Sequence, residues 1–116
     1  MQFVRVKSGD EKFYGQLEGG QVKRLTQAPY LGIEYDGQTY ALGSVELLAP
    51  AEPSKVVCIG QNYLDHKYEV AEIPPTVDPV LFLKPSTTIT GPECEVDYPE
   101  ICNNLHYEAE LGGIIG

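Results

Sequence analysis

Basic residues are scarce in this chain, which carries 8 Lys and Arg against 17 Asp and Glu, for a net charge of −9. A surface of this sign repels phosphate backbones and anionic lipid, so we expect neither nucleic-acid nor membrane binding. An anionic substrate would therefore need a local cation, either a metal or a placed lysine. No apolar run approaches the roughly 20 residues that span a bilayer, and no internal repeat is visible.

Cysteine is sparse as well. Cys58, Cys94 and Cys102 are an odd number, and no two of them form a CxxC pair. The first residues, Met1 to Lys7, alternate between apolar and polar side chains as a strand does and do not have the form of a signal peptide. These features predict a protein of the reducing cytoplasm.

Glycine and proline are abundant, at 12 and 9 residues, which favours strands and turns over a helical bundle. Residues 3–7 and 12–18 alternate in strand fashion, and Gly19-Gly20 predicts a hairpin after the second run. Another hairpin is predicted at Asp36-Gly37. Residues 1–52 are thus expected to form a small β domain, structural or lid-like, because no cluster of titratable groups is visible in it.

The second part of the chain, residues 53–116, follows a stiff linker with two prolines. Two short apolar runs, 55–60 and 80–83, are typical of strands buried on both faces. Lys84 ends the second run, where its ammonium either meets a carboxylate in a cleft or extends to solvent.

A short helix is predicted from about Tyr63 to Ala71, with Asn62 as its N-cap. His66 and Glu69 lie three residues apart on one helical face, within hydrogen-bonding reach. A carboxylate beside an imidazole raises its basicity, as a general base requires. An exposed pair on a polar helix face fits the same spacing.

Glu108 and Glu110 lie in a run, 106–116, that is expected to be a strand. Side chains alternate across a strand, so both carboxylates would point to the same face. Two like charges side by side repel unless something neutralises them, and a divalent cation would do so. A solvent-facing strand edge carrying two charges is the alternative.

Four motifs in this order resemble the fumarylacetoacetate hydrolase family, in particular its hydroxyheptadienedioate isomerases, acylpyruvases and oxaloacetate-handling enzymes. They are CIGQNYLDH (58–66), PVLFLKPS (79–86), Gly91-Pro92 and NLHYEAEL (104–111). The resemblance covers residues 55–116 densely and the first 50 more weakly. It implies a mainly β fold with short helices (α+β), in which the small N-terminal β domain precedes the beginning of a β-roll that dimerises.

The resemblance also implies the roles of individual residues. His66 and Glu69 would form the acid/base dyad, and Glu108 and Glu110 would be ligands of Mg²⁺ or Mn²⁺. Asn62, Tyr63 and Lys84 would bind the substrate. The implied substrate is a small 2-oxo or diketo carboxylic acid, isomerised, hydrolysed at a C–C bond or decarboxylated through a metal-bound enolate, for instance in the catabolism of aromatic compounds.

The family completes its metal site with an Asp beyond the Glu-x-Glu strand, and this chain holds no such third ligand. We therefore expect the chain to be the N-terminal part of an enzyme and inactive by itself, with a homodimer as the whole protein. Gln61 stands where relatives often carry Arg or Leu, which leaves the substrate open. The alternative is a non-catalytic β module for protein or ligand contact.

Overall fold

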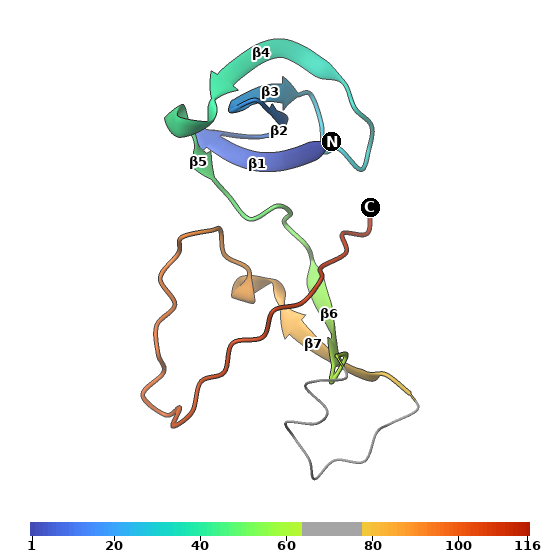
Figure 1. The fold of residues 1–116 in the computed structure, drawn as a ribbon, viewed down its shortest axis with the longest axis vertical. Coiled ribbons are helices and arrows are strands. Elements are labelled where there is room, and N and C mark those ends of the chain that lie inside the picture. The colour runs from blue at the N-terminus through green and yellow to red at the C-terminus, as the bar shows by residue number, and fades with distance from the viewer. Residues whose placement is uncertain (64–77) are drawn as a thin grey trace. The chain divides into compact units, whose positions relative to one another are not determined.

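The structure, a computed structural model, describes residues 1–63 and 78–116 (Figure 1). It is mainly β, as predicted, with two short 3₁₀ turns at Leu42–Ser44 and Ser86–Thr88 in the described parts. These parts form two compact units, one of Met1–Ala51 with Thr90–Gly116 and the other of Glu52–Ile89. Residues 1–63 and 78–116 contain seven strands: β1 (Gln2–Ser8), β2 (Glu11–Glu18), β3 (Gln21–Leu25), β4 (Tyr35–Ala41), β5 (Glu46–Leu47), β6 (Lys55–Gly60) and β7 (Val80–Pro85). The predicted division into domains 1–52 and 53–116 stays a prediction.

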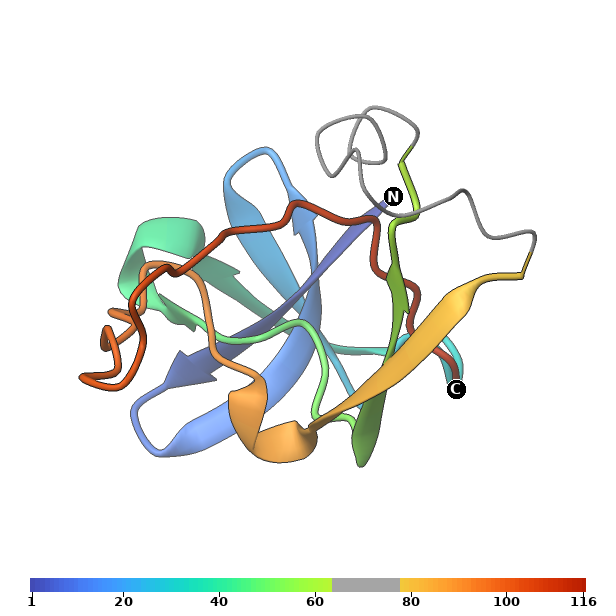
Figure 2. The same ribbon diagram turned by 90° about the horizontal axis from the view of Figure 1, so that it is seen from below.

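The first unit contains an antiparallel five-stranded sheet in the order β4-β3-β2-β1-β5 (Figures 1 and 2). The predicted hairpin at Gly19-Gly20 is confirmed, with Glu18 opposite Gln21. Both glycines have positive φ, 57° and 78°, the conformation that a two-residue hairpin turn requires and that glycine adopts without strain.

The second predicted hairpin, at Asp36-Gly37, is wrong. Strand β4 runs through both residues and pairs with β3. The register of the β3–β4 pair shifts between Lys23 and Leu25, and Gly37 has a φ of 86°. The conformational freedom of this glycine therefore permits an irregularity within β4 rather than a turn. The Asp36 carboxylate accepts the backbone N–H of Gln38 at 2.8 Å.

The core of this sheet consists of Val6, Phe13 and Val22. The two valines are fully buried, and the ring of Phe13 lies 4.9 Å from that of Tyr40. Gly15 permits the close approach of β2 and β3, because a Cβ there would lie 2.4 Å from Val22 Cγ1 and 3.0 Å from the Lys23 carbonyl oxygen.

The second unit contains the antiparallel pair β6 and β7, and both predicted strands are confirmed. Their predicted burial on both faces is wrong. The side chains of Val57 and Leu83, which are directly paired, are 58% and 69% exposed. A two-stranded ribbon covers neither of its own faces, because only a second layer can bury them.

The predicted strand over residues 106–116 is also wrong, because this segment is irregular backbone in the structure. A strand needs a partner for its N–H and C=O groups, and no described segment pairs with it. The predicted helix from Tyr63 to Ala71 falls almost wholly on residues 64–77, outside the described ranges. Within those ranges, no helix is long and apolar enough to cross a membrane.

Candidate functional site

The β6–β7 ribbon carries three of the predicted site residues. Asn62 and Tyr63 follow the end of β6, where Gly60 pairs with Val80. Lys84 lies at the other end of the ribbon, opposite Val56. Gly60 lies four residue steps along the strand from Val56, roughly 13 Å at 3.3 Å per residue. The ribbon therefore does not bring the backbone of Lys84 beside that of Asn62.

The Lys84 ammonium lies 5.9 Å from the ring centroid of Phe82, on the same face of β7. A cation at this distance is attracted by the negative face of an aromatic ring. The side chain is exposed, so the contact leaves the ammonium accessible to an anion from solution. This exposure is compatible with the predicted substrate-binding role of Lys84, which stays a prediction.

Gln61 takes a left-handed backbone conformation, with a φ of 54°, directly before Asn62 and Tyr63. This region costs about 1–2 kcal/mol for a residue with a Cβ. The turn is therefore strained at the point where the chain leaves β6 for the predicted dyad segment. No sequence signal predicts this, because glycine and not glutamine is the residue typical of such a position.

Glu108 and Glu110 lie on irregular, solvent-exposed chain in the first unit. Their chemistry fits a divalent cation, since carboxylate oxygens are the hard ligands that Mg²⁺ and Mn²⁺ prefer. The described residues include no group of three or more His, Cys, Asp or Glu side chains that could hold a metal. The two carboxylates would supply only part of a coordination shell.

The predicted dyad, His66 and Glu69, lies outside the described residues and stays a prediction. The remaining predicted residues divide between the two units: Asn62, Tyr63 and Lys84 belong to one, and Glu108 and Glu110 belong to the other. The predicted substrate-binding lysine and the predicted metal ligands therefore belong to different units.

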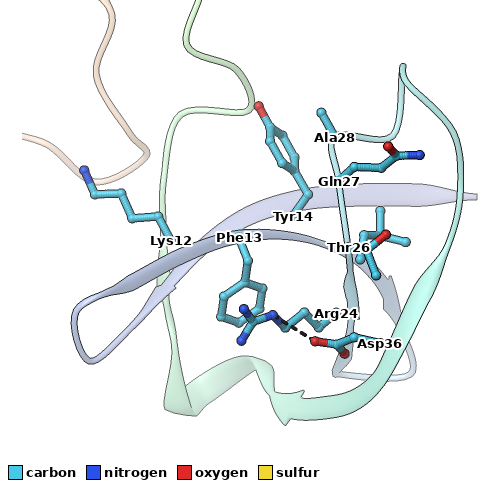
Figure 3. Close-up of a pocket in the computed structure, with 9 residues that line it drawn as sticks. Lys12, Phe13, Tyr14, Arg24, Thr26, Gln27, Ala28 and Asp36 are labelled. Carbon is cyan, nitrogen blue, oxygen red and sulfur yellow. Dashed lines mark ion pairs between the residues drawn. The ribbon is translucent and has the colours of Figure 1, made fainter.

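The N-terminal sheet contains a cluster of titratable groups that the sequence analysis missed. Arg24 of β3 donates to the Glu11 carboxylate at 2.8 Å and to the Tyr40 hydroxyl at 3.5 Å. Its Nε lies 3.0 Å from Asp36, and its guanidinium lies 4.6 Å from the ring centroid of Phe13 (Figure 3). Arg24 thereby ties three strands together. Its partners are distant in sequence, so spacing along the chain does not reveal them.

This cluster borders a hollow of about 430 Å³ whose lining includes Lys12 and Gln27 (Figure 3). The hydrogen bonds from Arg24 to Tyr40 and Glu11, more than the nearby charge of Glu11, raise the pKa of Arg24. Its charge is balanced by two carboxylates, which leaves little for an anionic ligand. The Arg24 cluster therefore stabilises the sheet by connecting its strands. The hollow beside it is a weaker candidate for a catalytic site than the predicted site residues in 55–116.

Two family models match the chain. The model described as "Fumarylacetoacetate (FAA) hydrolase C-terminal" matches residues 55–116, and "Rv2993c-like, N-terminal" matches residues 1–50. Protein Rv2993c of Mycobacterium tuberculosis is 37% identical over 123 residues, covering 100% of this chain and 46% of that protein. The mitochondrial oxaloacetate tautomerase FAHD1 of Rattus norvegicus is 49% identical over 63 residues, 53% of this chain and 27% of the tautomerase.

A solved structure extends the likeness to the fold. The 2-hydroxyhepta-2,4-diene-1,7-dioate isomerase from Mycobacterium marinum superposes with a TM-score of 0.62 at 35% identity. The match covers 78% of this chain and 34% of the isomerase. The chain therefore spans less than half the length of the proteins that it resembles.

Proposed function

This chain belongs to the fumarylacetoacetate hydrolase family, and we propose from that membership that the whole protein is a divalent-metal-dependent enzyme acting on a 2-oxo dicarboxylic acid. The observation that carries the proposal is the family match over residues 55–116, which contains all four motifs. Two of the similar proteins are named as an oxaloacetate tautomerase and a 2-hydroxyhepta-2,4-diene-1,7-dioate isomerase. Both names describe proton transfer in a dicarboxylate that has an oxygen substituent at carbon 2.

The reaction proposed first is therefore isomerisation between keto and enol forms. C–C hydrolysis and decarboxylation, in each of which bond cleavage leaves the product as an enolate that is then protonated, are the alternatives within the family. When bound, the cation would supply Lewis acidity that stabilises negative charge developing on oxygen. Glu108 and Glu110 are the residues proposed to hold it, together with a donor from the rest of the protein.

Proton transfer and substrate binding are proposed for other side chains of this chain. His66 is proposed to take the proton from carbon and return it, with Glu69 holding the imidazole in the basic tautomer. Lys84, with its exposed ammonium beside Phe82, is proposed to bind a substrate carboxylate. Asn62 and Tyr63 are proposed to shape the opposite end of the substrate site, since the ribbon holds them away from Lys84.

The test uses the full-length protein with oxaloacetate, following loss of the enol by ultraviolet absorbance and exchange of the carbon-3 protons with D₂O by NMR. We expect Mg²⁺-dependent exchange that EDTA abolishes. Glu110→Gln should lose this activity, whereas Glu95→Gln, a matched change at an exposed carboxylate on the same segment, should keep it. Release of pyruvate without faster exchange would instead identify a decarboxylase, and no activity on any 2-oxo acid would overturn the proposal.

A further inference from the structure

The segment that carries Glu108 and Glu110 is held to the N-terminal sheet near both of its ends. At the start, Gly91 lies against the backbone that follows β5: a Cβ on Gly91 would meet the Leu47 carbonyl oxygen at 3.3 Å and the Ala49 nitrogen at 3.4 Å. A Cβ at these distances would require the backbone after β5 to shift slightly, which glycine avoids. The glycine at position 91 therefore favours the first contact.

The second contact is made by Ile114, which is one of the residues that line an apolar hollow on the sheet. The other lining residues come from β1, β2, the loop after β3 and the segment after β5; they are Phe3, Val4, Tyr14, Pro29, Tyr30 and Pro50. The rings of Tyr14 and Tyr30 meet edge to face with their centroids 6.2 Å apart. Such a pair makes a rigid apolar wall with little conformational entropy to lose.

Among the aliphatic side chains near the end of this segment, Ile114 is the least exposed to solvent. Ile114 is 53% exposed, whereas Leu111 and Ile115 on either side of it are 90% and 94% exposed. Gly116 also lies on the ring of Tyr30, where a Cβ would meet Tyr30 Cβ and Cδ2 at 3.0 Å. Ile114 thus lines the hollow with about half of its surface covered, and Gly116 lies against the Tyr30 side chain beside it.

We propose that this hollow is a docking site for residues 114–116 of the same chain, and that Tyr30 thereby positions the Glu108–Glu110 carboxylates. A segment fixed near Gly91 and again at Ile114 samples far fewer conformations than one fixed at a single end. Fewer conformations lower the entropic cost of bringing two carboxylates to one cation. The docking depends only on the contacts, whereas its role for the carboxylates rests on the proposed function.

The docking is tested by NMR on the ¹⁵N- and ¹³C-labelled chain. We expect nuclear Overhauser effects from the Tyr30 ring to the Ile114 methyls and to the Gly116 α-protons. Gly116→Val should remove them, because its Cβ clashes with Tyr30. Gly113→Val is the matched control, because a Cβ there meets nothing within 4 Å. Absence of these effects in the unaltered chain would overturn the docking.

The positioning role is tested separately, by Mn²⁺ titration of the same samples. We expect Gly116→Val and Tyr30→Ala to raise the Mn²⁺ concentration that half-broadens the amides of Glu108 and Glu110 by about three- to tenfold. Tyr30→Phe, which keeps the ring, and Gly113→Val should leave it unchanged. An unchanged midpoint in Gly116→Val would overturn the positioning. Absence of selective broadening in every sample would likewise overturn the positioning, because an ordered pair of carboxylates would then not bind the ion, while the Overhauser effects would still establish the docking.

Discussion

Replacing Gly15 by Ala tests the packing of the N-terminal sheet. Strands of this sheet form the hollow that Ile114 contacts. The new Cβ would lie 2.4 Å from Val22 Cγ1 and 3.0 Å from the Lys23 carbonyl oxygen. Overpacking of this kind costs about 1–3 kcal/mol, and the loss of glycine's unfolded-state entropy returns about 0.5 kcal/mol. We expect a net loss of about 1.5 kcal/mol, which lowers the urea midpoint by about 1.5 M for a small unit.

Val22→Ala supplies the second arm of a double-mutant cycle. It deletes two fully buried methyl groups, worth about 1.6 kcal/mol in transfer and about 2–3 kcal/mol once the cavity is included. In the Gly15→Ala/Val22→Ala double variant, the Cβ at position 15 enters the space that Cγ1 has left. The combined loss should fall about 1 kcal/mol or more short of the sum of the single losses.

The assay is a urea titration followed through the amide signals of β1, β2 and β3, which reports this unit apart from the β6–β7 ribbon. Gly43→Ala is the matched control, because a Cβ on Gly43 meets nothing within 4 Å. Its midpoint should stay within about 0.5 M of the unaltered chain. A Gly15→Ala chain as stable as this control, or strictly additive losses in the cycle, would refute the strand packing described here.

Three further predictions concern the ion pair between Glu18 of β2 and Lys23 of β3, the turn at Gln61, and the predicted dyad of His66 and Glu69. The hydrogen bond from Lys23, at 2.5 Å, and then the charge of Lys23 lower the pKa of Glu18 from its ordinary value of 4.5. A lowered pKa stabilises the fold above the unfolded value, so the loss of stability in Glu18→Gln should vanish as the pH falls through the folded pKa and should shrink in salt. Gln61→Gly should slow amide exchange in β6, since relief of about 1 kcal/mol of strain exceeds about 0.5 kcal/mol of added unfolded entropy, and Gln61→Ala should not. Glu69→Gln in the full-length enzyme should lower kcat about 10²-fold with little change in KM, and an unchanged kcat would exclude the dyad.

Sequence patterns predicted the strands that local signals specify. The alternation in β2 and the glycine pair that follows it define the β2–β3 hairpin without reference to the rest of the chain. At Asp36-Gly37 the same reasoning failed, because a dipeptide that suits a turn equally suits an irregular strand once Asp36 has Arg24 as a cross-strand partner. That partner lies 12 residues earlier in the sequence, beyond the reach of turn rules.

The candidate site was predicted from motifs rather than from local structure. Lys84 at the end of β7 was correctly placed on a strand, because apolar runs and their ends are readable from sequence. The strand expected around Glu108 and Glu110 was not found, since a strand depends on a partner that alternation does not reveal. Arg24 and its carboxylates, and the contact of Tyr30 with Gly116, join residues far apart in sequence and became visible only in three dimensions.

Binding of Mn²⁺ by the full-length protein, followed by electron paramagnetic resonance, tests the proposed metal centre most directly. We expect one tightly bound ion per protomer, lost in Glu110→Gln and retained in Glu95→Gln. We also expect Mg²⁺ to displace the bound Mn²⁺ in competition. Equal Mn²⁺ binding by the unaltered protein and Glu110→Gln would contradict the assignment of Glu108 and Glu110 as ligands and, with it, the proposed enzyme.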